Sequence, residues 1–176
     1  SNLSLRVWRQ KVGAVKQYGF LFPDTIAFNI APGSEEINEE RLIKAVQIAN
    51  IKGFIESLPL GYNTKIGASG HGLSEGQKQR LLIARVIYKN PDIIIFDEAT
   101  NSLDANNEKV IVENLIEFFE GKTVIVVAHR LSTVKDADKI VVLDSGRIIE
   151  TGTHESLIQK KGAYYNLVKN QLELGN

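Results

Sequence analysis

The chain has 176 residues, the usual size of one domain, and its 43% hydrophobic and 24% charged residues are ordinary for a soluble globular protein. Lysine plus arginine and aspartate plus glutamate both number 21, so the formal net charge is zero, which argues against a broad nucleic-acid-binding surface. Cysteine is absent, which excludes disulfides, thiolate metal sites and a cysteine nucleophile. No apolar run approaches the about 20 residues of a membrane span, and the first residues lack the pattern of a signal peptide.

The first half of the chain contains one weak strand signal and two clear helix signals. Residues 12–16 weakly indicate a strand. Asn38 can cap a helix with acidic residues in its first turn, and apolar residues follow at helical spacing until Gly53, where we expect the helix to end. Residues 74–89 begin with the S-x-x-Q pattern of a capping box, which predicts a second helix.

The second half alternates buried strands with helices. The predicted elements are a strand at 92–96, a helix at 107–119, a strand at 123–128, an antiparallel hairpin at 139–143 and 147–150, and two helices within 153–174 that break at Gly162. The two single strands are short apolar runs rich in β-branched residues, as in parallel strands that are buried on both faces. This alternation predicts an α/β layered fold.

Polar side chains follow three of the predicted strands. Gln17 follows the first, the pair Asp97 and Glu98 follows the second, and His129 follows the third. Ligands of open α/β sheets bind beyond the carboxyl ends of the strands, so we expect these groups to share one edge. An aspartate after an apolar strand is the Walker B arrangement, in which one carboxylate holds hydrated Mg²⁺ and its neighbour, which points the other way, faces a water. The alternative is a pair of solvated or capping acids.

A second candidate site is the start of the helix at residues 74–89. The glycines at positions 67, 70 and 72 precede it, and a helix N-terminus presents free backbone N–H groups and a positive dipole end. That arrangement suits a phosphate group. The alternative, that Ser74 and Gln77 only form a capping box, is compatible with it, because a capping hydroxyl can also face a ligand.

Taken together, these motifs resemble the ATP-binding cassette of ABC transporters, in order and over nearly the whole chain. Residues 73–77 (LSEGQ) resemble the LSGGQ signature, and residues 96–100 (FDEAT) resemble the Walker B motif. The further correspondences are the D-loop at 101–104, the switch histidine at His129, the Q-loop at Gln17, and the C-terminal element of exporter-type cassettes at 152–157.

The resemblance implies ATP and Mg²⁺ as cofactors and assigns roles to these residues. It assigns catalysis to Glu98 and His129, and coordination of Mg²⁺ to Gln17 and, through water, to Asp97. It assigns phosphate binding to Gln17, Ser74, Gly76 and Gln77. Asp104 would make a nucleotide contact between subunits. Gln17 would also report to the transmembrane helices. In the family, two cassettes sandwich two ATP molecules head to tail, so the signature residues would close over nucleotide that a second copy holds.

The resemblance also implies a fold, partners and a location. The expected fold is a P-loop NTPase-like mixed sheet with flanking helices and a helical signature subdomain at about 31–90, the catalytic α/β core being 1–30 and 91–176. The expected partners are a second cassette in a homodimer and the transmembrane domain of the same transporter, with no nucleic acid. The expected location is the cytoplasmic face of the cell membrane, in bacteria the inner membrane.

Two departures from the family pattern affect these expectations. Glu75 replaces the first glycine of the signature and would cost electrostatic energy if its carboxylate pointed toward the phosphate. The phosphate-binding pattern GxxxxGK[ST] does not occur in the 176 residues. We therefore expect this to be the C-terminal part of a longer protein, truncated at its N-terminus, that has an exposed strand edge or apolar patch and does not hydrolyse ATP alone.

Two other functions stay open at this point. One is a soluble cassette ATPase that acts on DNA or ribosomes, against which the zero net charge and the exporter-like segments count. The other is a regulatory cassette that binds nucleotide without cleaving it, against which both Glu98 and His129 count. For the transporter, residues 68–91 and 96–108 look most like bacterial peptide or bacteriocin exporters.

Overall fold

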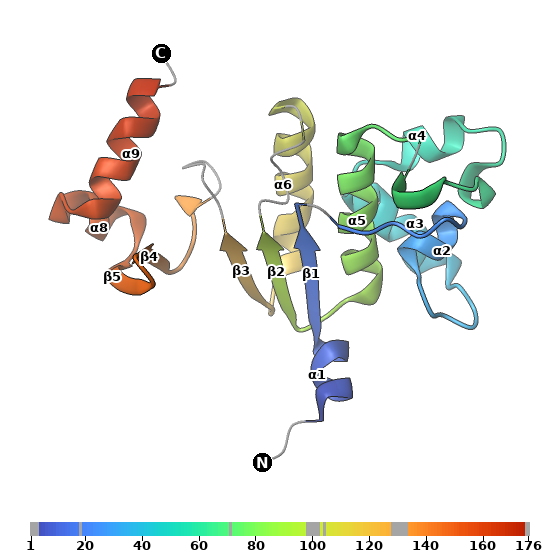
Figure 1. Ribbon diagram of the computed structural model, residues 1–176, viewed down its shortest axis with the longest axis horizontal. Helices are drawn as coiled ribbons and strands as arrows, with labels where there is room; N and C mark the ends of the chain where they lie inside the picture. Colours follow the sequence, from blue (N-terminus) through green and yellow to red (C-terminus); the bar gives the residue numbers. More distant parts are fainter. Residues whose placement is uncertain are drawn as a thin grey trace. The chain divides into compact units, whose positions relative to one another are not determined.

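The computed structural model describes residues 4–17, 19–70, 72–97, 103, 105–127 and 134–174. Its α-helices and strands are α1 Leu5–Lys11, β1 Val12–Lys16, α2 Ile26–Ile30, α3 Glu39–Ile48, α4 Lys52–Ser57, α5 Glu75–Lys89, β2 Ile93–Asp97, α6 Ala105–Phe119, β3 Thr123–Val127, β4 Ile140–Asp144, β5 Arg147–Gly152, α8 His154–Lys160 and α9 Ala163–Leu174 (Figure 1). Short 3-10 helices lie at Gly61–Asn63 and Ala68–Gly70. The chain divides into two compact units, Ser1–Val127 and Ala128–Asn176, and each is described by itself. None of the helices within the described ranges has the length and apolar character that a membrane crossing requires.

The first unit contains a three-stranded parallel sheet in the order β1-β2-β3. The predicted strands at 12–16, 92–96 and 123–128 are confirmed, β2 being displaced by one residue so that it includes Asp97. Figure 1 shows the three strands pointing in the same direction, so their carboxyl ends lie at one edge. On β3, Ile125 and Val127 are 48% and 47% exposed, which is the exposed apolar strand surface that the sequence predicts.

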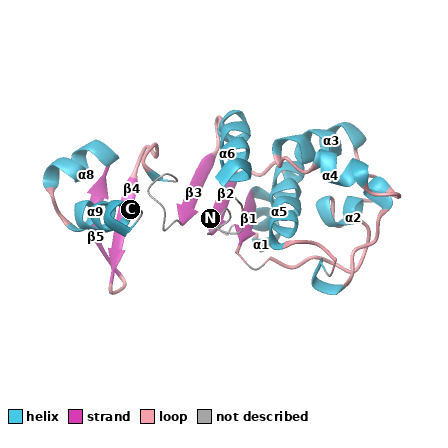
Figure 2. Ribbon diagram, turned by 90° about the horizontal axis from the view of Figure 1, so that it is seen from above, coloured by secondary structure: helices cyan, strands magenta, loops and turns pink. Residues whose placement is uncertain are grey.

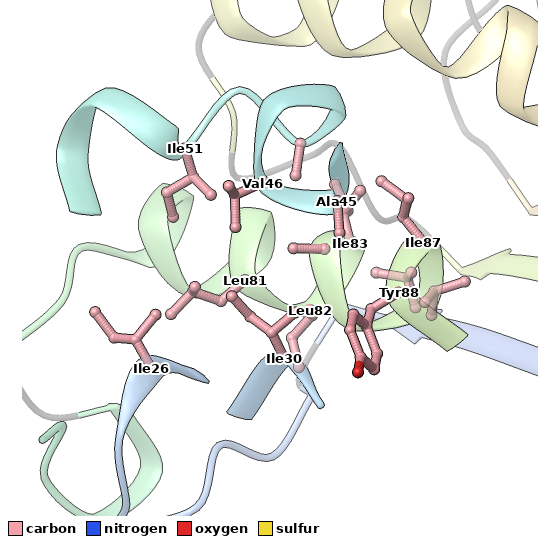
Figure 3. Packing of buried hydrophobic residues seen from close by; sticks show 14 of the residues in the cluster. Ile26, Ile30, Ala45, Val46, Ile51, Leu81, Leu82, Ile83, Ile87 and Tyr88 are labelled. Carbon is pink, nitrogen blue, oxygen red and sulfur yellow. The ribbon is translucent and has the colours of Figure 1, made fainter. Parts of the chain in front are cut away.

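A helical cluster packs beside this sheet, on the side of β1 (Figure 2). Helix α5 is its centre, because α2, α3 and β1 all pack against it. Figure 3 shows the side chains that fill this core: Ile26, Ile30, Ala45, Val46, Ile51, Leu81, Leu82, Ile83, Ile87 and Tyr88, all 8% exposed or less. Burying each large aliphatic side chain contributes about 1.5–3 kcal/mol, so this cluster fixes the position of α5.

The prediction that Gly53 ends the helix capped by Asn38 is wrong. Helix α3 ends at Ile48, and Gly53 lies inside the next helix, α4. Asn50 adopts the left-handed conformation, with φ of 51°, and the Ile51 N–H then reaches back to the carbonyl of Val46 at 3.0 Å. Asparagine adopts this conformation more readily than most other residues that carry a side chain, so Asn50 can terminate the helix in the way that glycine commonly does.

The second unit is an antiparallel hairpin, β4 and β5, with α8 and α9 packed on it. The hairpin and the two helices that break at Gly162 confirm the prediction for this region. Its core consists of Ile140, Val142, Leu157, Tyr164 and Val168. The buried carboxylate of Glu150 accepts a hydrogen bond from the N–H of Tyr164, in the first turn of α9, at 2.8 Å. A Cβ at position 162 would overlap this carboxylate, so a side chain there would displace Glu150 from its present position.

Candidate functional site

The carboxyl edge of the parallel sheet brings together two of the predicted site residues. Lys16, Asp97 and Val127 occupy matching positions in the register of β1, β2 and β3. Gln17 follows β1 in a turn, and both Gln17 and Asp97 are exposed. Parallel pairing aligns the strand ends, so the amide of Gln17 and the carboxylate of Asp97 lie at the same edge, as the sequence predicts.

Three other predicted site residues, Glu98, Asp104 and His129, lie outside the described residues. In the sequence, Glu98 directly follows the last residue of β2, and His129 comes two residues after the last residue of β3. Their assigned roles stay predictions.

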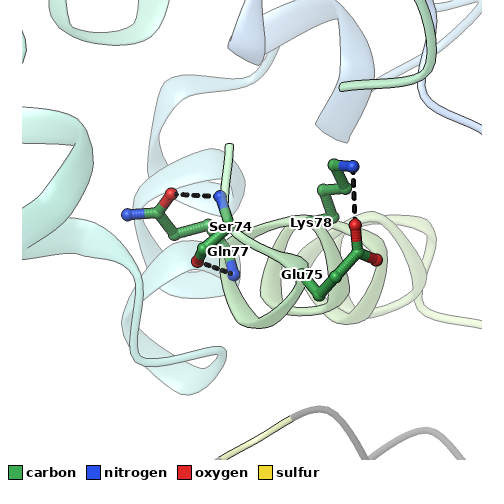
Figure 4. Close-up of polar contacts among 4 residues, drawn as sticks. All are labelled: Ser74, Glu75, Gln77 and Lys78. Atoms are coloured by element: carbon green, nitrogen blue, oxygen red, sulfur yellow. Dashed lines mark hydrogen bonds and ion pairs between the residues drawn. The ribbon is translucent and has the colours of Figure 1, made fainter. Parts of the chain in front are cut away.

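The first turn of α5 has the predicted capping box (Figure 4). The Gln77 N–H donates to the Ser74 hydroxyl oxygen at 3.2 Å, and the Ser74 N–H donates to Oε1 of Gln77 at 2.9 Å. In Figure 4 the Gln77 side-chain nitrogen points away from these two bonds. The capped turn fixes the Ser74 hydroxyl and the Gln77 amide in place, at the positive end of a 15-residue helix. Such an end favours an anionic group, and Gly76 adds no side chain between that group and the backbone.

The structure settles how Glu75 is accommodated. Its carboxylate forms an ion pair with Lys78, one turn further along α5, at 2.7 Å, and its side chain is 69% exposed. Figure 4 shows this pair on the side of the helix, apart from the capping box. The negative charge is therefore balanced and turned to solvent, so it does not oppose an anion at the helix N-terminus. An exposed pair of this kind adds little stability, typically about 0–1 kcal/mol.

Two further residues of α5 connect its first turns to neighbouring elements, and the sequence analysis missed both. Nε2 of Gln79, which is 3% exposed, lies 3.4 Å from the carbonyl oxygen of Lys16, at the end of β1. The Arg80 guanidinium donates to the carbonyl of Asn50 at 2.8 Å and to Oδ1 of Asn107 in α6 at 3.3 Å. The only signal in the sequence is that these polar residues lie two and three positions after the signature motif, which ends at Gln77.

The donor types at this edge fit a divalent cation that binds oxygen. Mg²⁺ takes carboxylate and carbonyl oxygens, keeps several waters, and binds with the help of substrate phosphates. Asp97 forms no ion pair with the part of the chain that the structure describes, which leaves its carboxylate available. No group of three or more acidic, histidine or cysteine side chains that could hold a metal occurs among the described residues. Asp97 and Gln17 are the described residues at this edge that could contribute oxygen ligands.

An open cavity of about 390 Å³ lies elsewhere, between α3 and α6. Asn90 and Lys122, which precede β2 and β3, line part of it, so it is near the amino ends of the strands. Ligands of such sheets bind at the opposite edge, and we therefore do not assign the site to this cavity.

Comparison with known proteins gives a consistent family. The family model described as ABC transporter matches residues 2–101. "ABC transporter B family member 14" of Arabidopsis thaliana is 49% identical over 170 residues, which are 97% of this chain and 14% of that protein. "ATP-dependent lipid A-core flippase" of Saccharophagus degradans is also 49% identical over 170 residues, which are 97% of this chain and 29% of that protein.

A solved structure of a bacterial Atm1-family ABC exporter with ATP bound matches the fold with a TM-score of 0.90 at 42% sequence identity. The match covers 94% of this chain and 29% of that chain and confirms the predicted α/β cassette fold. The chain thus spans between 14% and 29% of the length of these three proteins. The family model covers 100 of the 176 residues, which is more than half. The chain therefore belongs to the ABC transporter family.

Proposed function

We propose that this chain is part of the ATP-hydrolysing cassette of an exporter, which couples ATP binding and hydrolysis to transport. The observation that carries the proposal is the register of the parallel sheet, which puts Gln17 and Asp97 at one edge. The capped first turn of α5 supports it, because it is a second phosphate-binding element. The related flippase and the related ATP-bound exporter support export as the process that is driven.

In this proposal ATP, bound with Mg²⁺, supplies the terminal phosphoryl group whose hydrolysis drives transport. Asp97 and Gln17 hold the cation, Asp97 through water. Glu98 accepts a proton from the attacking water and orients it, as a general base. His129 contacts the terminal phosphate and keeps Glu98 in position relative to it.

The first turn of α5 acts on nucleotide that a second copy of the cassette holds. The Ser74 hydroxyl, the Gly76 backbone and the Gln77 amide donate to the terminal phosphate in a head-to-tail homodimer. Asp104 contributes to the contact between the two copies. The ion pair of Glu75 with Lys78 supports this role, because it keeps the glutamate charge away from the phosphate.

The finer assignments of the sequence analysis belong to the same proposal. Residues 31–90 form the helical signature subdomain, and residues 1–30 and 91–176 belong to the catalytic core. The cassette works at the cytoplasmic face of a bacterial inner membrane, with the transmembrane domain of the same transporter as its partner. Peptides or bacteriocins are the proposed cargo, which rests on the sequences of residues 68–91 and 96–108. Without a GxxxxGK[ST] loop, the 176 residues alone are inactive.

The Glu98→Gln variant of the intact transporter tests this proposal. We expect its rate of ATP hydrolysis to fall by about 100-fold or more, which is the usual contribution of a general base, while ATP binding stays unchanged. Glu113→Gln is the matched control, because Glu113 is exposed on α6 and pairs only weakly, at 4.0 Å, with Lys109. Full turnover by Glu98→Gln would refute the assignment of the base. Wild-type protein that binds ATP without hydrolysing it would indicate the regulatory cassette instead.

A further inference from the structure

The segment that follows Gln17 is held by a buried asparagine. Asn29, in α2, is fully buried, and its Oδ1 accepts a hydrogen bond from the N–H of Phe22 at 2.8 Å. Its side-chain nitrogen donates to the carbonyls of Phe22 and Thr25, both at 3.0 Å. Asn29 therefore fixes the backbone of residues 22–25 against α2.

An arginine from α5 joins the same group of contacts. Nε of Arg85 donates to the carbonyl of Asn29 at 2.7 Å, one terminal nitrogen donates to the carbonyl of Phe20 at 2.9 Å, and the other lies 3.2 Å from Oδ1 of Asn29. The guanidinium carbon also lies 5.6 Å from the centre of the Phe22 ring. A guanidinium carries several donors in a fixed planar arrangement, so it can hold both backbone carbonyls at once. We call Arg85, Asn29 and these contacts the Arg85–Asn29 clamp.

The clamp connects the two parts of the proposed site that act on phosphate. Arg85 lies eleven positions after Ser74 on the same helix, and Phe20 lies three positions after Gln17. Helix α5 is continuous and its residues between Gln79 and Tyr88 are largely buried, so a movement of its capped first turn is expected to move Arg85 as well. The hydrogen bonds of Arg85 pass that movement to the segment after Gln17.

We propose that Arg85 and Asn29 are positioning residues that make α5 and residues 19–30 move as one body. When the first turn of α5 closes on the terminal phosphate, this body transmits the movement to the transmembrane domain. The rings of Phe20 and Phe22 are 57% and 37% exposed on the same segment, which leaves this apolar surface available to a partner domain. The inference rests on the proposed function, because it presupposes a cassette that responds to ATP and a transmembrane domain attached to it.

Arg41 provides a matched control for Arg85. It lies on α3 and also holds α5, because one terminal nitrogen donates to the carbonyl of Tyr88 and its guanidinium carbon lies 4.9 Å from the centre of the Tyr88 ring. Like Arg85, it contacts a backbone carbonyl and an aromatic ring, although Arg85 makes two more hydrogen bonds. Arg41 contacts the far end of α5, however, away from the segment after Gln17. Loss of either arginine removes a contact between α5 and a neighbouring element, but only loss of Arg85 removes the proposed link.

Hydrogen exchange measured by mass spectrometry on the intact transporter in lipid nanodiscs, with and without ATP and vanadate, tests the clamp. In wild type we expect nucleotide to slow exchange in the first turn of α5 and in residues 19–30, and to change exchange in the transmembrane segments. In Arg85→Gln the first turn of α5 should still respond. Residues 19–30 should exchange about tenfold faster, a typical size for a coupling, and the transmembrane response should be lost. The KM for ATP should stay within about twofold, and Arg41→Gln should respond like wild type.

Arg85→Lys supplies a second test, which is needed if Arg85→Gln does not fold. A lysine keeps the charge but cannot hold two separated carbonyls in a fixed geometry, so it should retain only part of the transmembrane response. An unchanged transmembrane response in both Arg85 variants, or an equal loss in Arg41→Gln, would overturn the inference. Absence of ATP hydrolysis in wild type would instead refute the proposed function, so the two failures are distinguishable.

Discussion

Replacing Asn29 by alanine removes the centre of the Arg85–Asn29 clamp, and the structure allows its cost to be worked out. The side chain makes hydrogen bonds with three backbone groups, the N–H and carbonyl of Phe22 and the carbonyl of Thr25. Each such bond contributes about 1 kcal/mol, so the free energy of unfolding should fall by about 3 kcal/mol. The contact with Arg85 adds little, because that guanidinium keeps the carbonyls of Phe20 and Asn29. For a chain of this length, the melting temperature should fall by roughly 6–12 °C.

Urea unfolding of the 176-residue chain, followed by far-ultraviolet circular dichroism, measures this cost. Asn114→Ala is the control, because the Asn114 side chain makes one hydrogen bond, to the carbonyl of Ile48 at 3.2 Å. We expect this variant to lose about 1 kcal/mol. Equal losses of free energy in the two variants would show that the three bonds of Asn29 do not add, and the reasoning would then fail.

Two further predictions concern helix starts. Ser74→Ala and Thr153→Ala, which remove the caps of α5 and α8, should each lower the free energy of unfolding by about 1 kcal/mol. Only Ser74→Ala should also slow ATP hydrolysis by the intact transporter, by about tenfold or more. Equal steady-state rates of hydrolysis in the two variants would refute the phosphate role of Ser74. Hydrogen bonds from the N–H of Tyr164 and from Lys160 lower the pKa of the Glu150 carboxyl in the folded protein. The ionised carboxylate therefore stabilises the folded state at a pH above the glutamate pKa of the unfolded chain. This stabilisation is lost as the pH falls through the lower pKa of the folded state. Thermal unfolding of the second unit should therefore show an acid-side decrease that Glu150→Gln lacks, and identical pH profiles would contradict this.

The elements that the sequence predicts well are those fixed by neighbours in the chain. The capping box of Ser74 and Gln77 needs only residues within one helical turn, so its pattern is visible directly in the sequence. The strand at residues 93–97 is visible because both of its faces are apolar. The end of α3 was misplaced because asparagine and glycine can both adopt the left-handed conformation, and the pattern alone did not show that Asn50 does so.

The sequence could not show which way the polar side chains turn. Whether Glu75 faced a phosphate or solvent stayed open until the ion pair with Lys78 was seen. A glutamate three residues before a lysine on a helix permits that pair, but does not require it.

The sequence by itself determined the family, the parallel strands and the residue types that follow them, because these depend on local patterns of a few residues. Only the tertiary structure decided that Arg85 contacts Asn29, 56 positions away, and that Arg80 contacts Asn107, 27 positions away. An arginine on a helix has the same local pattern whether it faces solvent or a buried carbonyl. Its partner is set by the packing of α2, α5 and α6, and therefore by contacts between residues that are distant in the chain.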